Sequence, residues 1–171
     1  MNWARVSLII FMALACGLSA RRYAAEPVYI ASASMEPTLD IGRHLFLDKI
    51  TYRFRKPARQ EIICFESPVG ESHDSVKRVI AAEGDTVELR EKKVYLNGEP
   101  QLEIYTQYTR SGETLDGDNL GPLKVPPDSL FVLGDNRDNS NDSASWKDPA
   151  TGQKIYFIKL EKVKGKVRGF Y

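Results

Sequence analysis

The sequence contains only two cysteines, Cys16 and Cys64, and only two histidines, His44 and His73. So few cysteines cannot build a disulfide framework. Because Cys16 lies in an apolar N-terminal stretch and Cys64 in a strand-like run, we expect both to be unpaired. The histidines stand in no metal-ligand spacing. These low counts argue against a disulfide-stabilised fold and against a metal site, and we expect no metal and no cofactor.

The chain has almost no net charge, because 24 Lys and Arg residues balance 23 Asp and Glu residues to give +1. Nucleic-acid-binding proteins usually carry a strongly basic face, so we expect no nucleic-acid partner. Internal repeats are also absent. At 171 residues, of which 42% are hydrophobic, the chain fits one medium-sized domain, or one domain with a small insert.

One long apolar run is present, at the N-terminus. Residues 6–20 carry no charge, and counting from Trp3, with Arg5 placed at the interface, gives 18 residues. A helix of that length spans roughly 27 Å, which is just short of the hydrocarbon core of a bilayer. Three interpretations compete: a membrane anchor, a cleaved signal peptide and a lipoprotein signal.

Two of these interpretations conflict with particular residues. A lipoprotein signal before Cys16 would need a large aliphatic residue where Ala13 stands, and cleavage after Ala20 would place Leu18 where a small residue is preferred. We therefore predict an uncleaved anchor over residues 1–24, with one transmembrane helix. Its orientation is not determined by charge, because basic residues flank both ends of the run.

The remainder, residues 25–171, has the pattern of a mainly β protein. Short apolar or alternating segments are separated by Gly, Pro and Asn turns, and Asn97-Gly98 is one such turn signal. The expected strands lie within residues 44–50, 61–66, 75–82, 86–89, 94–96, 129–133 and 155–167, whereas basic residues 53–59 are expected to form a loop. We predict antiparallel β-sheet with a small inserted β subdomain over residues 85–128.

A serine-bearing turn at residues 32–39 opens this β-rich part. Ser34 lies between small residues and precedes Met35, and Pro37 disfavours helix at Glu36. Ser34 can therefore present its hydroxyl to solvent at the end of an extended segment. By itself the pattern is also that of an ordinary loop whose serines bond their own backbone.

A serine hydroxyl becomes a good nucleophile only when a base takes its proton. Neither His44 nor His73 lies beside a strong turn or glycine signal, so the alternative is a neutral lysine. Lys77 is the candidate, because its strand is largely apolar. Lysine has a reference pKa of about 10.4, so a base working near neutral pH needs a downward shift of roughly two to three units, or about 3 to 4 kcal/mol of desolvation. An ordinary surface lysine is the competing interpretation.

Residues 134–143 form a loop dense in acids and amides. The spacing does not fit a calcium loop, because Ser143 stands where a glycine is needed and Pro149 where a glutamate is needed. The loop is therefore either a self-bonded polar turn or part of a site in which Ser140 orients the lysine amine.

Together, three segments resemble bacterial type I signal peptidases, the leader peptidases that are membrane-anchored Ser/Lys serine proteases. They are residues 34–39, residues 77–85 and residues 134–143, in the family's order and behind an apolar N-terminus. The resemblance implies a membrane-anchored endopeptidase that removes N-terminal signal peptides from exported preproteins. It also implies a location in the bacterial cytoplasmic membrane, with the catalytic domain on the extracytoplasmic side.

The resemblance further implies a role for each matching residue. Ser34 would be the nucleophile and Lys77 the general base. Ser32 would donate its hydroxyl to the oxyanion beside the backbone N–H of Ser34, and Ser140 would hydrogen-bond the lysine amine. Met35, Gly134 and Asp142 would support the site. The expected partners are membrane lipids and signal peptides with small residues at −3 and −1, with no metal and no nucleic acid.

Two features depart from the family pattern. Ala144 stands where the family commonly has arginine, so we expect a loop salt bridge to be missing or replaced by Lys147. Residues 146–152 replace an apolar segment that the family usually has there.

Three alternatives remain open. A self-cleaving repressor-type peptidase would need a DNA-binding helix pair at the N-terminus, and a pilin or conjugation-type maturation peptidase would differ in its substrate. A catalytically inactive, membrane-tethered binding module would cleave nothing.

Overall fold

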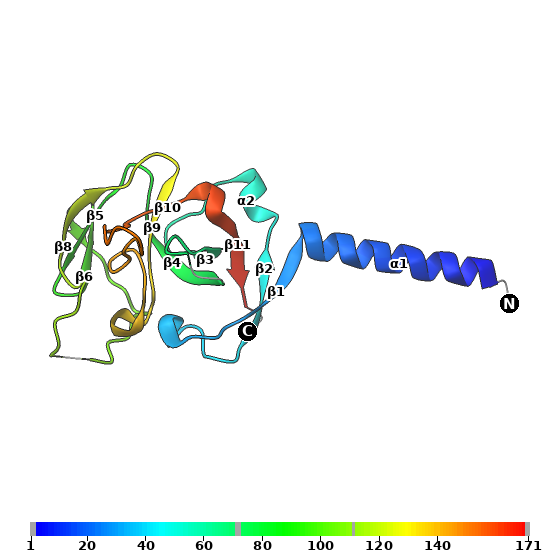
Figure 1. The fold of residues 1–171 in the computed structure, drawn as a ribbon, viewed down its shortest axis with the longest axis horizontal. Helices are drawn as coiled ribbons and strands as arrows, with labels where there is room; N and C mark the ends of the chain where they lie inside the picture. Colours follow the sequence, from blue (N-terminus) through cyan, green and yellow to red (C-terminus); the bar gives the residue numbers. More distant parts are fainter. Residues whose placement is uncertain (1–2, 71–72, 111, 170–171) are drawn as a thin grey trace.

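The computed structural model describes residues 3–70, 73–110 and 112–169, and shows a β-rich body with one helix projecting from it (Figure 1). The helix, α1 (Trp3–Tyr23), leads directly into strand β1. Apolar side chains along it are exposed, for example Trp3 at 72% and Phe11 at 69%. Among the described residues, no helix has the length and hydropathy needed to cross a membrane. The predicted helix is therefore confirmed, whereas its assignment as a transmembrane span is not supported.

The larger sheet has seven strands, and every pairing in it is antiparallel. Its spatial order is β1-β2-β11-β3-β4-β9-β10. The strands are β1 (Ala25–Tyr29), β2 (His44–Asp48), β3 (Ile62–Glu66), β4 (Asp74–Ala82), β9 (Ser129–Leu133), β10 (Ile158–Lys159) and β11 (Val163–Arg168). The prediction of a mainly antiparallel β fold is confirmed.

A smaller sheet lies between β4 and β9 in the sequence and forms the opposite end of the body from α1 (Figure 1). Its four strands, in spatial order, are β7 (Glu99–Pro100), β6 (Lys93–Leu96), β5 (Thr86–Arg90) and β8 (Leu120–Lys124). All of them fall within the stretch predicted as an inserted subdomain, whose status as a separate domain stays a prediction.

The hairpin of β5 and β6 is paired as expected, with Val87 opposite Leu96. Its connecting turn is Glu91-Lys92, and both residues have positive φ, at 49° and 68°. Such a turn matches the right-handed twist of the flanking strands. The Asn97-Gly98 signal instead marks the following turn, from β6 to β7.

Alternating apolar residues of the strands build three buried clusters. One of them joins the two sheets, with Val87 and Phe131 both at 0% exposure. Another contains Trp146, which is 1% exposed and packs edge-on against Phe65 at 5.8 Å between ring centroids. Residues 146–152, which depart from the family pattern, therefore supply a core anchor.

A four-residue helix, α2 (Thr51–Phe54), occupies the start of the segment expected to be a loop. The carboxylate of Asp48 explains this, because it accepts the backbone N–H groups of Ile50 and Thr51, both at 2.9 Å. Three turns of 3-10 helix, η1 (Ala33–Met35), η2 (Arg137–Asn139) and η3 (Leu160–Lys162), complete the described elements.

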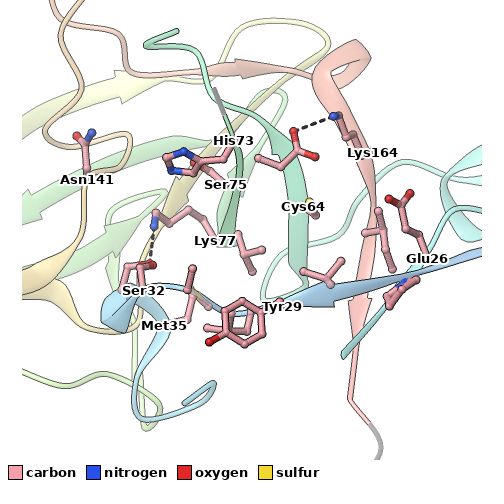
Figure 2. Close-up of a pocket in the computed structure, with 18 of the residues that line it drawn as sticks. Glu26, Tyr29, Ser32, Met35, Cys64, His73, Ser75, Lys77, Asn141 and Lys164 are labelled. Carbon is pink, nitrogen blue, oxygen red and sulfur yellow. Dashed lines mark hydrogen bonds and ion pairs between the residues drawn. The ribbon is translucent and has the colours of Figure 1, made fainter. Parts of the chain in front are cut away.

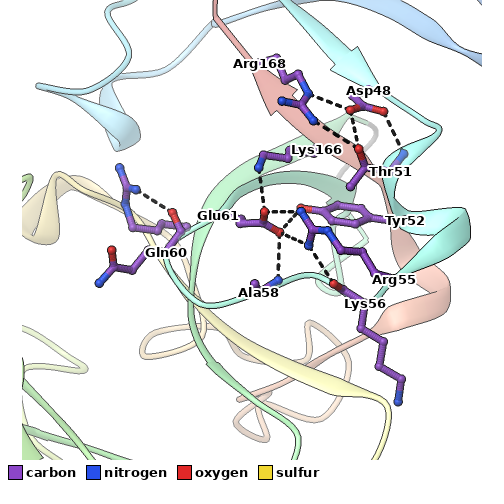
Figure 3. Close-up of polar contacts among 11 residues, drawn as sticks. Asp48, Thr51, Tyr52, Arg55, Lys56, Ala58, Gln60, Glu61, Lys166 and Arg168 are labelled. Atoms are coloured by element: carbon purple, nitrogen blue, oxygen red, sulfur yellow. Dashed lines mark hydrogen bonds and ion pairs between the residues drawn. The ribbon is translucent and has the colours of Figure 1, made fainter.

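A partly buried carboxylate, 13% exposed, ties α2 to the larger sheet (Figure 3). Glu61 accepts hydrogen bonds from Arg55, the Ala58 backbone N–H, Lys166 and the Tyr52 hydroxyl. Burial alone would raise the pKa of Glu61, but these donors outweigh it and hold the pKa well below its usual value.

Candidate active site

Ser34 lies in η1, just after β1 leaves the edge of the larger sheet. The turn is fixed from below, because Met35 is 1% and Leu39 4% exposed, and burying a side chain of this size stabilises by about 1.5–3 kcal/mol. Glu36 is extended, at φ −65° and ψ 145°, as the following proline predicts. Ser34 itself is only 7% exposed, so its hydroxyl does not face open solvent as expected but turns into a cleft.

Lys77 reaches Ser34 from β4. Its Nζ lies 2.7 Å from Ser34 Oγ, and the residue is 5% exposed. Lys77 pairs with Ile63 of β3 on one side, while β9 joins the other side of β4 only from Arg78 onward. The amine therefore lies at the point where β4 opens onto the cleft. The structure brings together two side chains that are 43 residues apart in sequence.

Ser32 completes a row of three polar side chains. Its Oγ lies 3.2 Å from Ser34 Oγ, and Figure 2 shows Ser32 and Lys77 at the same end of the cleft. His73 also lines the cleft, whereas the His44 ring lies tilted against the Tyr29 ring at 5.2 Å between centroids. Of the basic side chains considered from the sequence, Lys77 is the one placed at hydrogen-bond distance from the serine.

The cleft has a volume of about 1060 Å³. One wall is β1 with the residues that follow it, and the other is the start of β4. Apolar side chains form part of its lining, among them Val28, Met35, Leu47, Cys64 and Val76. Burial raises the pKa of the Cys64 thiol to about 12, so that thiol stays neutral. Cys64 and Cys16 are both unpaired, as expected.

The far end of the cleft is polar. Glu26 pairs with Lys49 there, and Asp74 pairs with Lys164 at 2.7 Å. In Figure 2, Glu26 and Lys164 lie on the opposite side of the cleft from Ser32. The site therefore consists of a serine and an amine at one end of an extended groove with an apolar middle.

The loop at residues 134–143 closes the site from behind. Asn136 donates its backbone N–H to the Ser34 carbonyl at 3.1 Å. A Cβ at Gly134 would lie 2.5 Å from that same carbonyl oxygen and closer still to Ser140 Oγ, so only glycine permits this approach. Asp142 accepts the Gly134 N–H at 2.9 Å and the Ala144 N–H at 3.1 Å. Self-bonding thus shapes the loop and seats it on the serine backbone.

Ser140 was expected to hydrogen-bond the lysine amine, but the structure shows no such bond. Its Oγ is buried and has no hydrogen-bond partner within the described part of the chain. The side chain lies instead against Gly134, in the space that the absence of a Cβ leaves. Ser140 is therefore next to the site without contacting Lys77 through a hydrogen bond.

Of the two outcomes expected for the loop salt bridge, that it is missing or that Lys147 replaces it, the described residues show the first. Lys147 pairs with Asp116 at 2.8 Å, and Asp142 is instead held by backbone N–H groups. Ala144 is 7% exposed and packs against Gly117. A Cβ added to Gly117 would lie only 2.8 Å from the Ala144 Cβ. Position 117 therefore has no room for a side chain while Ala144 keeps this position.

Sequence reasoning missed a buried ion pair beside the two central residues. Arg78, which follows Lys77, donates through Nε to Asp135 Oδ1 at 2.8 Å and through Nη2 to Asp135 Oδ2 at 2.6 Å. Its side chain is 10% exposed and that of Asp135 is 1% exposed. Thr38 also donates to Asp135. The pair therefore joins β4, the serine turn and the polar loop, but its members are 57 residues apart and no spacing rule links them.

Comparison with known proteins identifies the class of protein that this fold and site belong to. The family model described as signal peptidase, peptidase S26, matches residues 2–171. The chain belongs to this family, which confirms the resemblance seen in the sequence.

Individual relatives agree with this family assignment. The chain is 39% identical over 150 residues to the "Probable signal peptidase I-2" of Synechocystis sp., covering 85% of this chain and 66% of the relative. It is 38% identical over 144 residues to the signal peptidase I of Leptolyngbya laminosa, covering 80% and 68%. The chain thus spans about two thirds of the length of these relatives.

A solved structure supports the fold. The crystal structure of a signal peptidase I from Enterococcus faecalis V583 matches at a TM-score of 0.52 and 30% identity, covering 67% of this chain and 98% of that one. The repressor-type alternative finds no support, because the described residues before β1 form the single helix α1 and not a helix pair.

Proposed function

We propose that this protein is a membrane-anchored serine endopeptidase that removes N-terminal signal peptides from exported preproteins, with Ser34 as nucleophile and Lys77 as general base. The observation that carries the proposal is the 2.7 Å separation of Lys77 Nζ and Ser34 Oγ at the buried end of a cleft. Membership of the signal peptidase family supports the substrate class.

The proposed reaction proceeds through an acyl-enzyme. The Lys77 amine, neutral before reaction, takes the Ser34 proton while Oγ bonds to the scissile carbonyl carbon. The C–N bond then breaks, and the resulting ammonium returns its proton to the leaving amine of the mature protein. A water molecule, deprotonated by the same amine, next attacks the ester. The bond between the acyl carbon and Ser34 Oγ then breaks, the ammonium returns the proton to Oγ, and the signal peptide leaves with a free carboxylate.

Burial of the amine supports its role as a base. A surface lysine stays charged at neutral pH, whereas removal from water disfavours the charged form. Ser32 Oγ, 3.2 Å from Ser34 Oγ, is near enough to donate to the developing oxyanion. Such donors are usually worth about 2.7 to 4 kcal/mol in the transition state.

The shape of the cleft favours an extended peptide. β1 is an edge strand of the larger sheet, and residues 74–77 of β4 have no strand pairing on their β9 side. A peptide can therefore add as a strand between these two edges. With Met35 and Val76 in the lining, this arrangement suits small side chains at −3 and −1.

We place α1 at the cytoplasmic membrane of a bacterium, as a single-pass anchor with the catalytic part on the extracytoplasmic side. The exposed apolar side chains of α1, such as Ile9 at 67% and Leu14 at 62%, support contact with membrane lipids. Basic residues at both ends of the helix leave the orientation to the family resemblance.

The proposal is tested with a matched pair of preproteins in detergent, one with alanine at −1 and one with phenylalanine there. The purified protein should cleave the first at least about tenfold faster, because a groove shaped for small residues excludes the larger ring. Mass spectrometry of the products would locate the cut.

If neither preprotein is cleaved, the proposal is refuted and the inactive binding module is favoured. Equal cleavage of both would refute the proposed substrate preference. A pilin-type precursor is assayed alongside the pair, and cleavage of that precursor alone would favour the maturation peptidase.

A further inference from the structure

A segment of the insert, residues 101–107, lies against the loop that closes the site. The segment and the loop exchange backbone hydrogen bonds. The Gln107 N–H donates to the Asp135 carbonyl at 2.8 Å, and the Arg137 N–H donates to the Gln107 carbonyl at 3.0 Å. Gln107 and Asn136 consequently form a short parallel bridge. The insert therefore braces the loop that bonds to the Ser34 carbonyl.

Glu103 is the inward-facing residue of this segment. Its neighbours Leu102 and Ile104 are each 89% exposed, whereas the Glu103 side chain is only 7% exposed. Its Oε1 accepts from Arg137 Nη2 at 2.6 Å and from the Tyr105 hydroxyl at 2.7 Å. The segment thus places a carboxylate under the loop while it exposes two aliphatic side chains.

Arg137 is equally buried, with 5% of its side chain exposed. Burial alone would lower the pKa of its guanidinium, but the Glu103 charge outweighs this and raises it. Buried ion pairs are expensive to desolvate and often add little net stability. A pair of this kind is therefore better explained by what it holds in place than by the stability it adds.

The Glu103–Arg137 pair holds the backbone around the nucleophile. Arg137 Nε donates to the Gly134 carbonyl at 3.2 Å. Gly134 in turn lies directly against the Ser34 carbonyl, which accepts the Asn136 N–H. A chain of direct contacts therefore runs from the carboxylate of the insert to the residue that carries the reacting hydroxyl.

A second contact links the same segment to the other half of the site. The Tyr105 ring lies beneath the Arg78 guanidinium, 4.0 Å from its Cζ to the ring centroid. Arg78 directly follows Lys77 on β4 and pairs with Asp135. Glu103 therefore bonds the residue whose ring supports Arg78, as well as the arginine that holds Gly134.

We propose that Glu103 is a positioning residue of the peptidase site, acting through Arg137 and the backbone of residues 134–136 to hold Ser34 at its attack geometry. This inference rests on the proposed function. It assigns the insert a role in turnover that is separate from peptide binding, because residues 101–107 are not part of the cleft lining.

The test compares Glu103→Gln with Glu99→Gln, which removes the same charge from an exposed position in β7. Cleavage of the alanine-containing preprotein is measured at saturating and limiting substrate. Since small displacements of reacting groups cost up to about 100-fold in rate, Glu103→Gln should lower kcat by about 10- to 100-fold with KM within about twofold. Glu99→Gln should match the wild type.

A further variant separates positioning from folding. Loss of one partner leaves a buried arginine unpaired, so Glu103→Gln can also lose stability. The double variant Glu103→Gln/Arg137→Met removes both charges, keeps an apolar stem of similar volume and should fold. Its kcat should nevertheless stay about 10-fold or more below the wild type, because nothing then donates to the Gly134 carbonyl from that side.

The outcomes distinguish this inference from the proposed function. An active wild type with unchanged kcat in Glu103→Gln, or in the folded double variant, would overturn the positioning role alone. A raised KM with unchanged kcat would also overturn it, because the segment would then act on peptide binding. A wild type without cleavage would overturn both proposals.

Discussion

Replacement of Lys77 by alanine is expected to abolish preprotein cleavage, and Ser34→Ala to do the same. Each change removes one member of a pair whose reacting atoms are 2.7 Å apart. Without the amine, the described residues leave Ser34 Oγ with the Ser32 hydroxyl at hydrogen-bond distance, and a hydroxyl is too weak a base to take the proton. Without the Ser34 hydroxyl no acyl-enzyme forms. Residues that act as such a unit each carry nearly the whole effect, so kcat should fall by about 10,000-fold or more.

Two measurements guard this result against trivial causes. Circular dichroism and thermal unfolding should show that both variants retain the β fold. Lys93→Ala, at an exposed position of β6 in the smaller sheet, removes the same charge and should cleave like the wild type. Substantial cleavage by the folded Lys77→Ala variant would exclude Lys77 as the base. Cleavage by the Ser34→Ala variant would exclude Ser34 as the nucleophile.

Replacement of Asp135 by alanine is expected to cause the largest loss of stability. It would leave the Arg78 guanidinium, whose side chain is 10% exposed, without its carboxylate. It would also leave the Thr38 hydroxyl without its acceptor. Breaking one side of a buried pair typically costs about 3–5 kcal/mol, so the free energy of unfolding measured in urea should fall by about that amount.

A surface carboxylate provides the matched comparison. Asp116→Ala removes a group that is 54% exposed and pairs with Lys147 and Lys154, so it should cost far less than Asp135→Ala. The double variant Asp135→Ala/Arg78→Met should regain part of the loss, since no buried charge is left unpaired. Equal effects of Asp135→Ala and Asp116→Ala would show that the Arg78–Asp135 pair does not hold the site together.

Much of the larger sheet was predictable because its central strands are short apolar runs. The expected strand at 61–66 and the observed β3 (Ile62–Glu66) differ by one residue, and β9 (Ser129–Leu133) matches its prediction. The three strands missing from the expected set, β1, β7 and β8, all lie at sheet edges and contain Pro27, Pro100 and Pro122, respectively. Proline is tolerated at an edge because no ladder hydrogen bond is lost there. In the sequence, however, proline argues against a strand, so these edge strands were not predicted.

The candidate site was predictable only where family motifs carry it. Ser34, Lys77 and Gly134 were singled out from the sequence, and the structure brings all three together. The contacts that hold them, from Asp135 and Glu103, join residues that are far apart in sequence and so have no local signature. Whether Ser140 bonds the amine was likewise a question of side-chain direction, which sequence cannot answer.

The mechanism can be tested by varying the pH only over the range in which the protein stays folded, so its stability toward acid matters. For Asp48, as for Glu61, burial alone would raise the pKa, but hydrogen bonds from Thr51, Arg168 and Ile50 outweigh it and lower the pKa. A carboxyl with a lowered folded-state pKa contributes stability that is present above its unfolded pKa of about 4 and is lost as the pH falls below that value. Between about pH 5 and pH 8 these contributions should therefore remain constant.

The pH dependence of kcat/KM in that window tests the central claim most directly, because it reports the protonation state of the free enzyme's base. If a neutral Lys77 amine takes the Ser34 proton, kcat/KM should fall about tenfold per pH unit on the acid side while the fold, followed by circular dichroism, stays unchanged. A flat profile down to about pH 5 would contradict a lysine base at this site.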